Sequence, residues 1–476
     1  MPHLLHHHHR PHNHYDYIYN IGYIFSAALV ALGFLVDSPM GIWNGLVKII
    51  TSQDLLITDY FYLAGPGAAM VNAGIVTALS MAVLQLSGEH CNGFSIVEIG
   101  LMSGFALFGK NFINMWPVIF GTWLYAKYQH EPFKKYSSVG LMATALSPFV
   151  SYMAMGCSFA SIPLGLFIGI VIGFILPSLA AYTYKVQNGM NLYNMGFACG
   201  ILSLLLVPML TALGDKPKIV LYWAEGYNLQ FGIILTVFCL FLIMVGLFFK
   251  HPAWSVWAGY RRLLSTTGRL PGDYLRMFGG SPVLVNIGVN GLIATAYILI
   301  IGGQLNGPTI GGILSVMGFS AMGKHTRNIW PIMVGVGLCA ALVHGDVALP
   351  QMQMAALFGT ALAPIAGHFG WFFGIVAGFI HGALVMQTGD PVGGLNLYNN
   401  GFSAGFIVIV LYPTLTAIVR HRRIHIRDED YYDLFEEDTP IDISRWRTHG
   451  MDNPRVMDEW EHLHHREHKL HKHNDD

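Results

Sequence analysis

The residues best suited to bind a polar solute occur in two matching groups that are 214 positions apart (306 minus 92). Each group begins with Asn-Gly, continues through an apolar run that contains further glycines, and closes with Gly-Lys and a later Asn. The members are Asn92, Gly93, Lys110 and Asn114 in the first group, and Asn306, Gly307, Lys324 and Asn328 in the second. Because an asparagine amide both donates and accepts hydrogen bonds, we predict that these residues contact a polar solute.

The apolar runs at 93–108 and 307–323 are too short to cross a membrane as straight helices. About 15 residues of helix span roughly 23 Å, whereas the hydrocarbon core of a bilayer is about 30 Å thick. A pair of short apolar helices, one in each of two repeats, is typical of the binding site of a transporter. The alternative is that the Asn and Gly residues cap helices and permit close packing.

The charged residues of these runs are candidates for proton coupling and for anion binding. Glu98 lies inside the first run, and Gly312 takes its place in the second. A single carboxylate in an apolar segment is costly, so we predict that Glu98 carries a proton, with His381 as its partner. Alternatively, a neighbouring Asn satisfies Glu98. Lys110 and Lys324 either attract an anion or extend to the lipid headgroups, and their position at segment ends favours the second interpretation.

A second motif, Asn-Leu-Tyr-Asn-x-Gly-Phe, occurs at 191–197 and again at 396–402. It opens an apolar segment in each half and contributes four further candidate contacts to the solute, which are Tyr193, Asn194, Tyr398 and Asn399. An Asn within an apolar membrane segment is destabilising unless it is paired. The motif therefore either lines the solute path or forms a hydrogen-bonded clasp between helices.

The composition indicates a membrane protein. Of 476 residues, 53% are hydrophobic and 11% are charged, whereas soluble domains carry about 25% charged residues. This excludes a large soluble enzyme. The five cysteines show no paired spacing, which argues against a zinc or redox site. The His-rich N-terminus lacks the basic start of a signal peptide, so we expect the first apolar segment to remain in the membrane.

Three short stretches resemble enzyme signatures but lie in the wrong context. Residues 104–110 and 318–324 fit the phosphate-loop pattern GxxxxGK, but they lack its Ser or Thr and no strand precedes them. Residues 401–405 fit GxSxG inside an apolar segment, without the strand-to-helix turn that a nucleophile needs. We therefore expect neither an enzyme nor a bound cofactor.

The matches continue over most of the chain, which predicts two tandem membrane repeats at 17–227 and 228–420. We expect about seven apolar segments in each repeat. The fold class is then all-α, a polytopic membrane protein with short or broken helices. Polar, His-rich segments flank the repeats at 1–16 and 421–476, and His462 and His465 of the second are candidate ligands of a transition metal.

Loop charge predicts how the repeats are oriented. The loop that carries Lys127, Lys134 and Lys135 is basic, whereas its counterpart near His344 and Asp346 is not. Lys and Arg concentrate on the cytoplasmic side of a membrane. Equivalent loops are therefore expected on opposite faces, which means inverted repeats, an odd number of crossings in each, and both termini on the cytoplasmic side of a bacterial inner membrane.

The twin NLYNxGFxxG and GK…NxWP motifs resemble those of an uncharacterised bacterial membrane-protein family that is catalogued as a domain of unknown function. This resemblance implies no substrate and no functional residue. The expected seven-plus-seven inverted repeats are similar to the architecture of nucleobase and anion transporters, by analogy of fold alone. The Tyr-Asn-x-Gly element is loosely similar to one in urea channels.

The sequence as a whole favours a secondary transporter of a small polar solute or ion, proton-coupled through Glu98. One alternative is a passive channel for a small neutral solute. Another is a membrane-anchored metal sensor that uses the His-rich ends. The expected partners are the solute and the lipid bilayer. A homo-oligomer is compatible with the sequence, and we expect no binding of nucleic acid.

Overall fold

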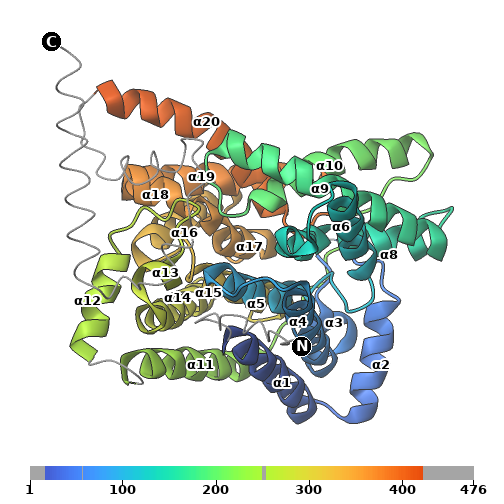
Figure 1. The fold of residues 1–476 in the computed structure, drawn as a ribbon, viewed down its shortest axis with the longest axis horizontal. Helices are drawn as coiled ribbons and strands as arrows, with labels where there is room; N and C mark the ends of the chain where they lie inside the picture. The colour runs from blue at the N-terminus through green and yellow to red at the C-terminus, as the bar shows by residue number, and fades with distance from the viewer. Residues whose placement is uncertain (1–16, 56, 249–252, 422–476) are drawn as a thin grey trace, which may run out of the picture.

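A computed structural model describes residues 17–55, 57–248 and 253–421 of the protein. This described part is built from helices and contains no β-strand (Figure 1). The helices of the first half are α1 (Tyr17–Val36), α2 (Pro39–Ile50), α3 (Tyr60–Ala64), α4 (Pro66–Ser87), α5 (Gly93–Phe105), α6 (Trp116–Tyr128), α7 (Ser137–Ala143), α8 (Ser147–Met155), α9 (Ile162–Gln187) and α10 (Asn194–Ala212).

The second half repeats this order of helices. Its members are α11 (Asn228–Phe248), α12 (Ala253–Leu263), α13 (Tyr274–Phe278), α14 (Gly280–Ile300), α15 (Gly307–Phe319), α16 (Thr326–Cys339), α17 (Pro350–Phe358), α18 (Ala363–Phe369), α19 (Trp371–Thr388) and α20 (Asn399–His421). Short tight turns of helix join some of them, among them η2 (Thr144–Leu146) and η4 (Gly359–Leu362). In Figure 1 most helices of the first half lie on the right and most of the second half on the left, with α5 and α15 between them.

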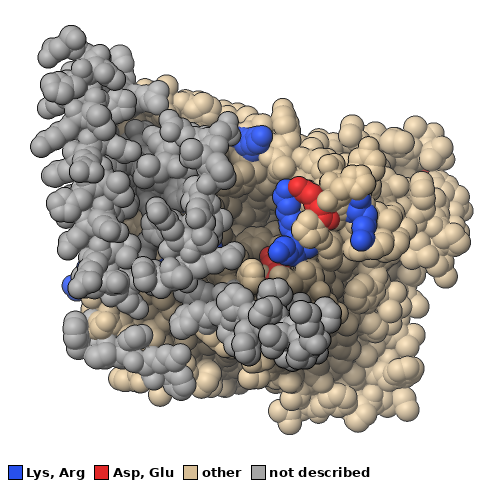
Figure 2. Space-filling view, in the orientation of Figure 1, with Lys and Arg blue, Asp and Glu red and all other residues tan. Residues whose placement is uncertain are grey.

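Ten helical spans of the described residues are long and apolar enough to cross a membrane. The all-α polytopic membrane fold is thereby confirmed. The predicted short helices are also present, since α5 and α15 contain 13 residues each. Figure 2 shows one face of the molecule, and its described part carries few charged side chains apart from a small group right of the centre. Many large hydrophobic side chains of the described residues are exposed, among them Leu35, Leu86 and Ile300, which suits contact with lipid more than contact with water.

The two short helices pack directly against each other through glycine. A Cβ atom on Gly104 would lie 2.6 Å from the carbonyl oxygen of Gly311, and one on Gly311 would lie 2.5 Å from that of Gly104. At the other end of the contact, Gly318 faces Val97. Residue numbers therefore rise along one helix as they fall along the other, so α5 and α15 are antiparallel. Small residues allow this close backbone approach.

Each repeat supplies an aspartate that caps the short helix of the other repeat. Asp59, just before α3, accepts a hydrogen bond from the Gly307 amide at the start of α15 (3.2 Å). Asp273, just before α13, accepts one from the Gly93 amide at the start of α5 (3.1 Å). A carboxylate at a helix N-terminus satisfies free amides and complements the helix dipole. Because α5 and α15 are antiparallel, these equivalent aspartates lie at opposite ends of the helix pair.

Each Asn-Leu-Tyr-Asn motif likewise forms hydrogen bonds with the opposite repeat. The Asn191 side chain donates to the carbonyl of Gly401 (3.1 Å), and the Asn396 side chain donates to that of Gly196 (3.3 Å). The first Asn of each motif thus forms the predicted clasp between the repeats. Leu192 and Leu397 also bond through their amides to η4 and η2 of the opposite repeat. The halves therefore interlock through equivalent contacts, as two-fold related units do.

The glycine contact generates a prediction about stability. Gly104→Ala places a methyl group against backbone and should lower the free energy of unfolding by about 1–3 kcal/mol. Gly232→Ala in α11 is the matched control, because its Cβ would meet nothing closer than 3.6 Å. Thermal unfolding in detergent should show a lower midpoint for the first variant and an unchanged or higher one for the second. Equal midpoints would show that the α5–α15 contact is loose.

Candidate functional site

Two equivalent clusters of one lysine and two aromatic rings lie beside the paired short helices. The first cluster consists of Phe105, Lys110 and Tyr398, and the second cluster consists of Phe319, Lys324 and Tyr193. The Lys110 ammonium lies 5.7 Å from the centre of the Phe105 ring and 5.9 Å from that of Tyr398. In the second cluster the corresponding distances are 5.1 Å to Phe319 and 4.4 Å to Tyr193. Each cluster thus takes its tyrosine from the opposite repeat.

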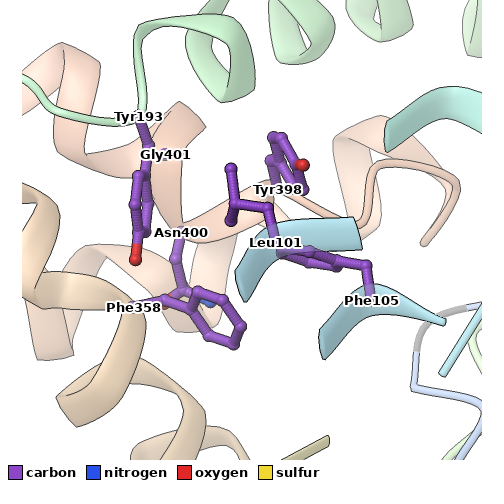
Figure 3. A pocket seen from close by; sticks show the side chains of 7 residues that line it. All are labelled: Leu101, Phe105, Tyr193, Phe358, Tyr398, Asn400 and Gly401. Carbon is purple, nitrogen blue, oxygen red and sulfur yellow. The ribbon is translucent and has the colours of Figure 1, made fainter. Parts of the chain in front are cut away.

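A small apolar cavity lies between the two clusters and is lined by three of their four rings, those of Phe105, Tyr193 and Tyr398 (Figure 3). Phe358 of α17 bridges the clusters, since its ring centre lies 5.3 Å from that of Phe105 and 6.1 Å from that of Tyr193. The volume of about 10 Å³ has room for roughly one water molecule. The residues that line it are Leu101, Phe105, Tyr193, Phe358, Tyr398, Asn400 and Gly401. Of these seven residues, only the two tyrosines were predicted from the sequence as contacts to a solute.

Both lysines are fully buried, with exposed fractions of 0%. The expectation that they extend to the lipid headgroups is therefore wrong. Gly109 and Gly323 explain how the chain turns them inward, because their φ angles of 82° and 95° are favourable for glycine alone. The side chains of Asn72 and Asn286 then hold the carbonyls of the two lysines, at 2.9 and 2.8 Å.

Neither buried lysine forms an ion pair within the described part of the chain. The salt bridges found there join Lys135 to Glu131 and Arg276 to Asp273. Aromatic faces attract a cation more strongly once water is excluded. A ring face attracts a cation less strongly than a carboxylate does. An ammonium group beside these rings could therefore still bind an anion.

The two clusters differ in how well their polar groups are satisfied. In the second cluster, Lys324 donates to the Tyr193 hydroxyl (2.6 Å), which also lies 2.5 Å from the hydroxyl of Ser315. In the first cluster, the hydroxyl of Tyr398 has no hydrogen-bond partner among the described residues. Lys110 there contacts the thioether of Met102 at 3.4 Å. A thioether is a weak acceptor for an ammonium group.

Glu98 lies on the same face of α5 as the first cluster. Positions 98, 101, 102 and 105 share one side of a helix, whereas Gly100 and Gly104 face α15 on another side. Glu98 has an exposed fraction of 1%, and neither of its carboxylate oxygens has a partner in the described structure. It is about 6 Å of helix rise from Met102, the residue that contacts Lys110.

His381 has hydrogen-bonding neighbours within the second repeat. Its Nε2 lies 3.1 Å from the side-chain oxygen of Asn400, and its Nδ1 lies 3.4 Å from the hydroxyl of Ser403. Asn400 lines the cavity, so His381 is connected to the cavity through one side chain. Its pairing with Glu98 stays a prediction.

The asparagines at the starts of the short helices act as caps. The Asn92 side chain accepts from the Phe94 amide (2.7 Å), and the Asn306 side chain accepts from the Thr309 amide (3.2 Å). Their neighbours Gly93 and Gly307 bind the capping aspartates. These contacts agree with the alternative interpretation, in which the residues stabilise helix ends. Asn92 lies about 14 Å along the helix from Leu101, which lines the cavity.

The asparagines that follow the short helices hold the lysine-bearing loops. The Asn114 side chain donates to Asp54 and to Ser151, at 3.1 Å each. The Asn328 side chain donates to the carbonyl of Gly323 (2.8 Å) and accepts from the amide of His325 (2.8 Å). Both are buried and position the loops of Lys110 and Lys324, a role that their spacing alone does not reveal.

The last asparagine of each Asn-Leu-Tyr-Asn motif is half satisfied. Asn194 donates to the Ala180 carbonyl (2.9 Å), and Asn399 donates to the Thr388 hydroxyl (3.0 Å). The side-chain oxygen of each lacks a partner in the described structure. His462 and His465 lie outside the described residues. Within those residues no group of three or more His, Cys, Asp or Glu side chains is arranged to hold a metal ion.

The difference between the clusters predicts unequal effects of two matched substitutions. Tyr193→Phe removes the acceptor of the buried Lys324 ammonium and should lower the free energy of unfolding by about 1–3 kcal/mol. Tyr398→Phe removes a hydroxyl that has no partner and should change it little. Thermal unfolding without added solutes measures both. A larger loss for Tyr398→Phe would contradict the described asymmetry.

Comparison with known proteins identifies a family for this chain. A family model described as "Protein of unknown function (DUF1576)" matches it twice, at residues 38–212 and 253–417. No curated protein and no solved structure matches the chain. The double match confirms the internal duplication. The chain therefore belongs to the DUF1576 family of proteins of unknown function, and it carries the family's domain in two tandem copies.

Proposed function

We propose that the protein is a secondary transporter that moves a small polar solute through the cavity between its two repeats. One observation carries the proposal: the cavity lies beside α5 and is lined by both repeats, by Phe105 and Tyr193 of the first and by Tyr398 of the second. Binding sites of repeat-built transporters lie at such an interface, beside interrupted helices.

Contacts between loops support an inverted arrangement of the repeats. Asp59 and Asp273 are equivalent, and they lie at opposite ends of the α5–α15 pair. The end near Asp273 carries Arg269 and Arg276 in the adjoining segment, whereas the segment before Asp59 carries Asp54. Since basic residues concentrate on the cytoplasmic side, we assign the Asp273 end to the cytoplasm.

Both described ends of the chain lie toward this cytoplasmic end. Near the start of α1, the Tyr19 hydroxyl donates to the carbonyl of Glu89, which lies four positions before Gly93 in the chain. Near the end of α20, Tyr412 bonds to Asn188, which Arg269 also contacts. These contacts favour cytoplasmic termini and an odd number of crossings in each repeat. A bacterial inner membrane is the site that we propose.

Small relative movement of the repeats would expose the cavity to one side at a time. The glycine contact between α5 and α15 lets two rigid backbones pivot without side chains in the way. The small volume of the ring-lined cavity favours such alternating access over a passive channel, which requires a continuous path. We assign proton coupling to Glu98, because a carboxylate buried in the membrane near a second one, Glu89, is more readily accommodated when it is protonated.

Glu98→Gln tests the proposal in proteoliposomes. If one proton moves with one solute, a pH difference of about one unit drives about tenfold accumulation. We expect the variant to lose this accumulation and to retain exchange of labelled for unlabelled solute, since glutamine mimics the protonated acid. Glu131→Gln, in a loop outside the membrane segments, is the control. Uptake is measured for labelled short-chain carboxylates, amides and polyols, and unchanged accumulation by Glu98→Gln would refute the assignment.

A further inference from the structure

The first cluster and the neighbouring Glu98 together contain several buried polar groups that lack a strong hydrogen-bond partner in the described structure. Glu98, Lys110 and Tyr398 are all buried, with exposed fractions of 1%, 0% and 4%. The carboxylate and the hydroxyl have no partner in the described structure, and the ammonium has a thioether. Burying such groups unpaired is strongly unfavourable. Tyr398 lines the cavity, Lys110 lies over the Tyr398 ring, and Glu98 lies one turn of α5 before Leu101 and Met102, so a ligand that enters here from the cavity side would complete their interactions.

The sequence itself creates this difference between the clusters. Ser315, which bonds to Tyr193 in the second cluster, is replaced at the equivalent position by Leu101. Glu98 has Gly312 as its counterpart, where a Cβ would already meet Leu357 at 2.7 Å. Duplicated helices have thus acquired different surroundings: one cluster is closed by its own side chains and the other is left with free donors.

We propose that the first cluster binds the carboxylate group of a small monocarboxylate anion, which is the transported substrate. The Lys110 ammonium and the Tyr398 hydroxyl are the donors. This assignment rests on the transport function proposed above and names its substrate class. Charge sets the sign of the ligand, since the nearest cationic group lacks a carboxylate partner. A charge-assisted hydrogen bond is short and strong, so two donors suffice to orient one carboxylate.

The remaining lining sets the size and polarity of the substrate. Leu101, Phe105 and Phe358 present apolar surface to the cavity, which suits a short hydrocarbon tail. A strongly hydrated inorganic anion would lose its water there without replacement. The volume of about 10 Å³ in this closed state excludes large ligands. This volume holds about one water molecule, so an acid of two to four carbons binds only after the rings move apart.

Glu98 gives this binding reaction its dependence on protons. The titratable groups near Glu98 are Glu89, Tyr19 of α1 and Tyr398. An ionised Glu98 would repel an incoming carboxylate on the same face of α5, whereas a protonated Glu98 would not. One anion and one proton then move together, and the net charge carried is zero. No bond is made or broken other than the O–H bond of Glu98, whose proton enters from one side and leaves on the other.

Ligand-dependent thermal unfolding of the purified full-length protein tests the proposal. The probes are sodium propionate, propionamide and sodium chloride, each at the same concentration and total ionic strength. Propionate should raise the unfolding temperature, while propionamide, which has the same shape without the charge, and chloride should not. Lys110→Met should abolish the shift. Tyr398→Phe, which is expected to fold normally, should weaken apparent affinity about tenfold or more.

Controls and contrary outcomes separate this inference from the transport function. Lys127→Met removes an exposed lysine and should leave the propionate shift unchanged. Equal stabilisation by propionamide or by chloride, or a full propionate shift in Tyr398→Phe, would overturn the carboxylate site even if Lys110→Met fails to fold. Accumulation of a neutral solute in proteoliposomes without carboxylate binding would refute the substrate alone. Carboxylate binding without any flux would refute the transport function alone.

Discussion

The structure depends on one close backbone contact, between α5 and α15 at Gly104 and Gly311. A helix of 13 residues is too short to span a bilayer and cannot by itself shield its ends from lipid. Packed backbone to backbone, the two short helices form a single central unit, and longer helices surround it. The lysines, the tyrosines and the capping aspartates all take their positions from this pair.

Aromatic rings make it possible to bury two lysines near this unit. A ring face attracts an ammonium group without supplying a negative charge, so a lysine that is charged there still lacks a counterion. Phe105 and Phe319 come from the short helices, while the tyrosines come from the opposite repeat. Relative movement of the repeats must therefore change both clusters together. The geometry of the two clusters is thereby tied to the arrangement of the two repeats.

Much of the architecture was predictable because the internal duplication makes each motif occur twice in the sequence. The motifs that begin at Asn92 and recur at Asn306 predicted the two short helices. The low fraction of charged residues predicted a membrane protein. The burial of Lys110 and Lys324 was not predictable, because a lysine at a segment end is compatible with either direction of its side chain. The direction depends on left-handed glycines and on asparagines of α4 and α14. Phe358 was missed for a similar reason, since only tertiary packing brings α17 to the cavity.

The exchanged aspartate caps have a consequence for how such a protein could have arisen. A chain with a single repeat would carry one capping aspartate and one short helix. The aspartate could not reach that helix, because each aspartate caps the short helix of the other repeat. Such a chain could satisfy Asp59 and the helix amides only by pairing with a second molecule inserted upside down. Under the proposed inverted arrangement, the ancestor was therefore an antiparallel pair whose members entered the membrane in both senses, and fusion of two genes fixed one sense for each half.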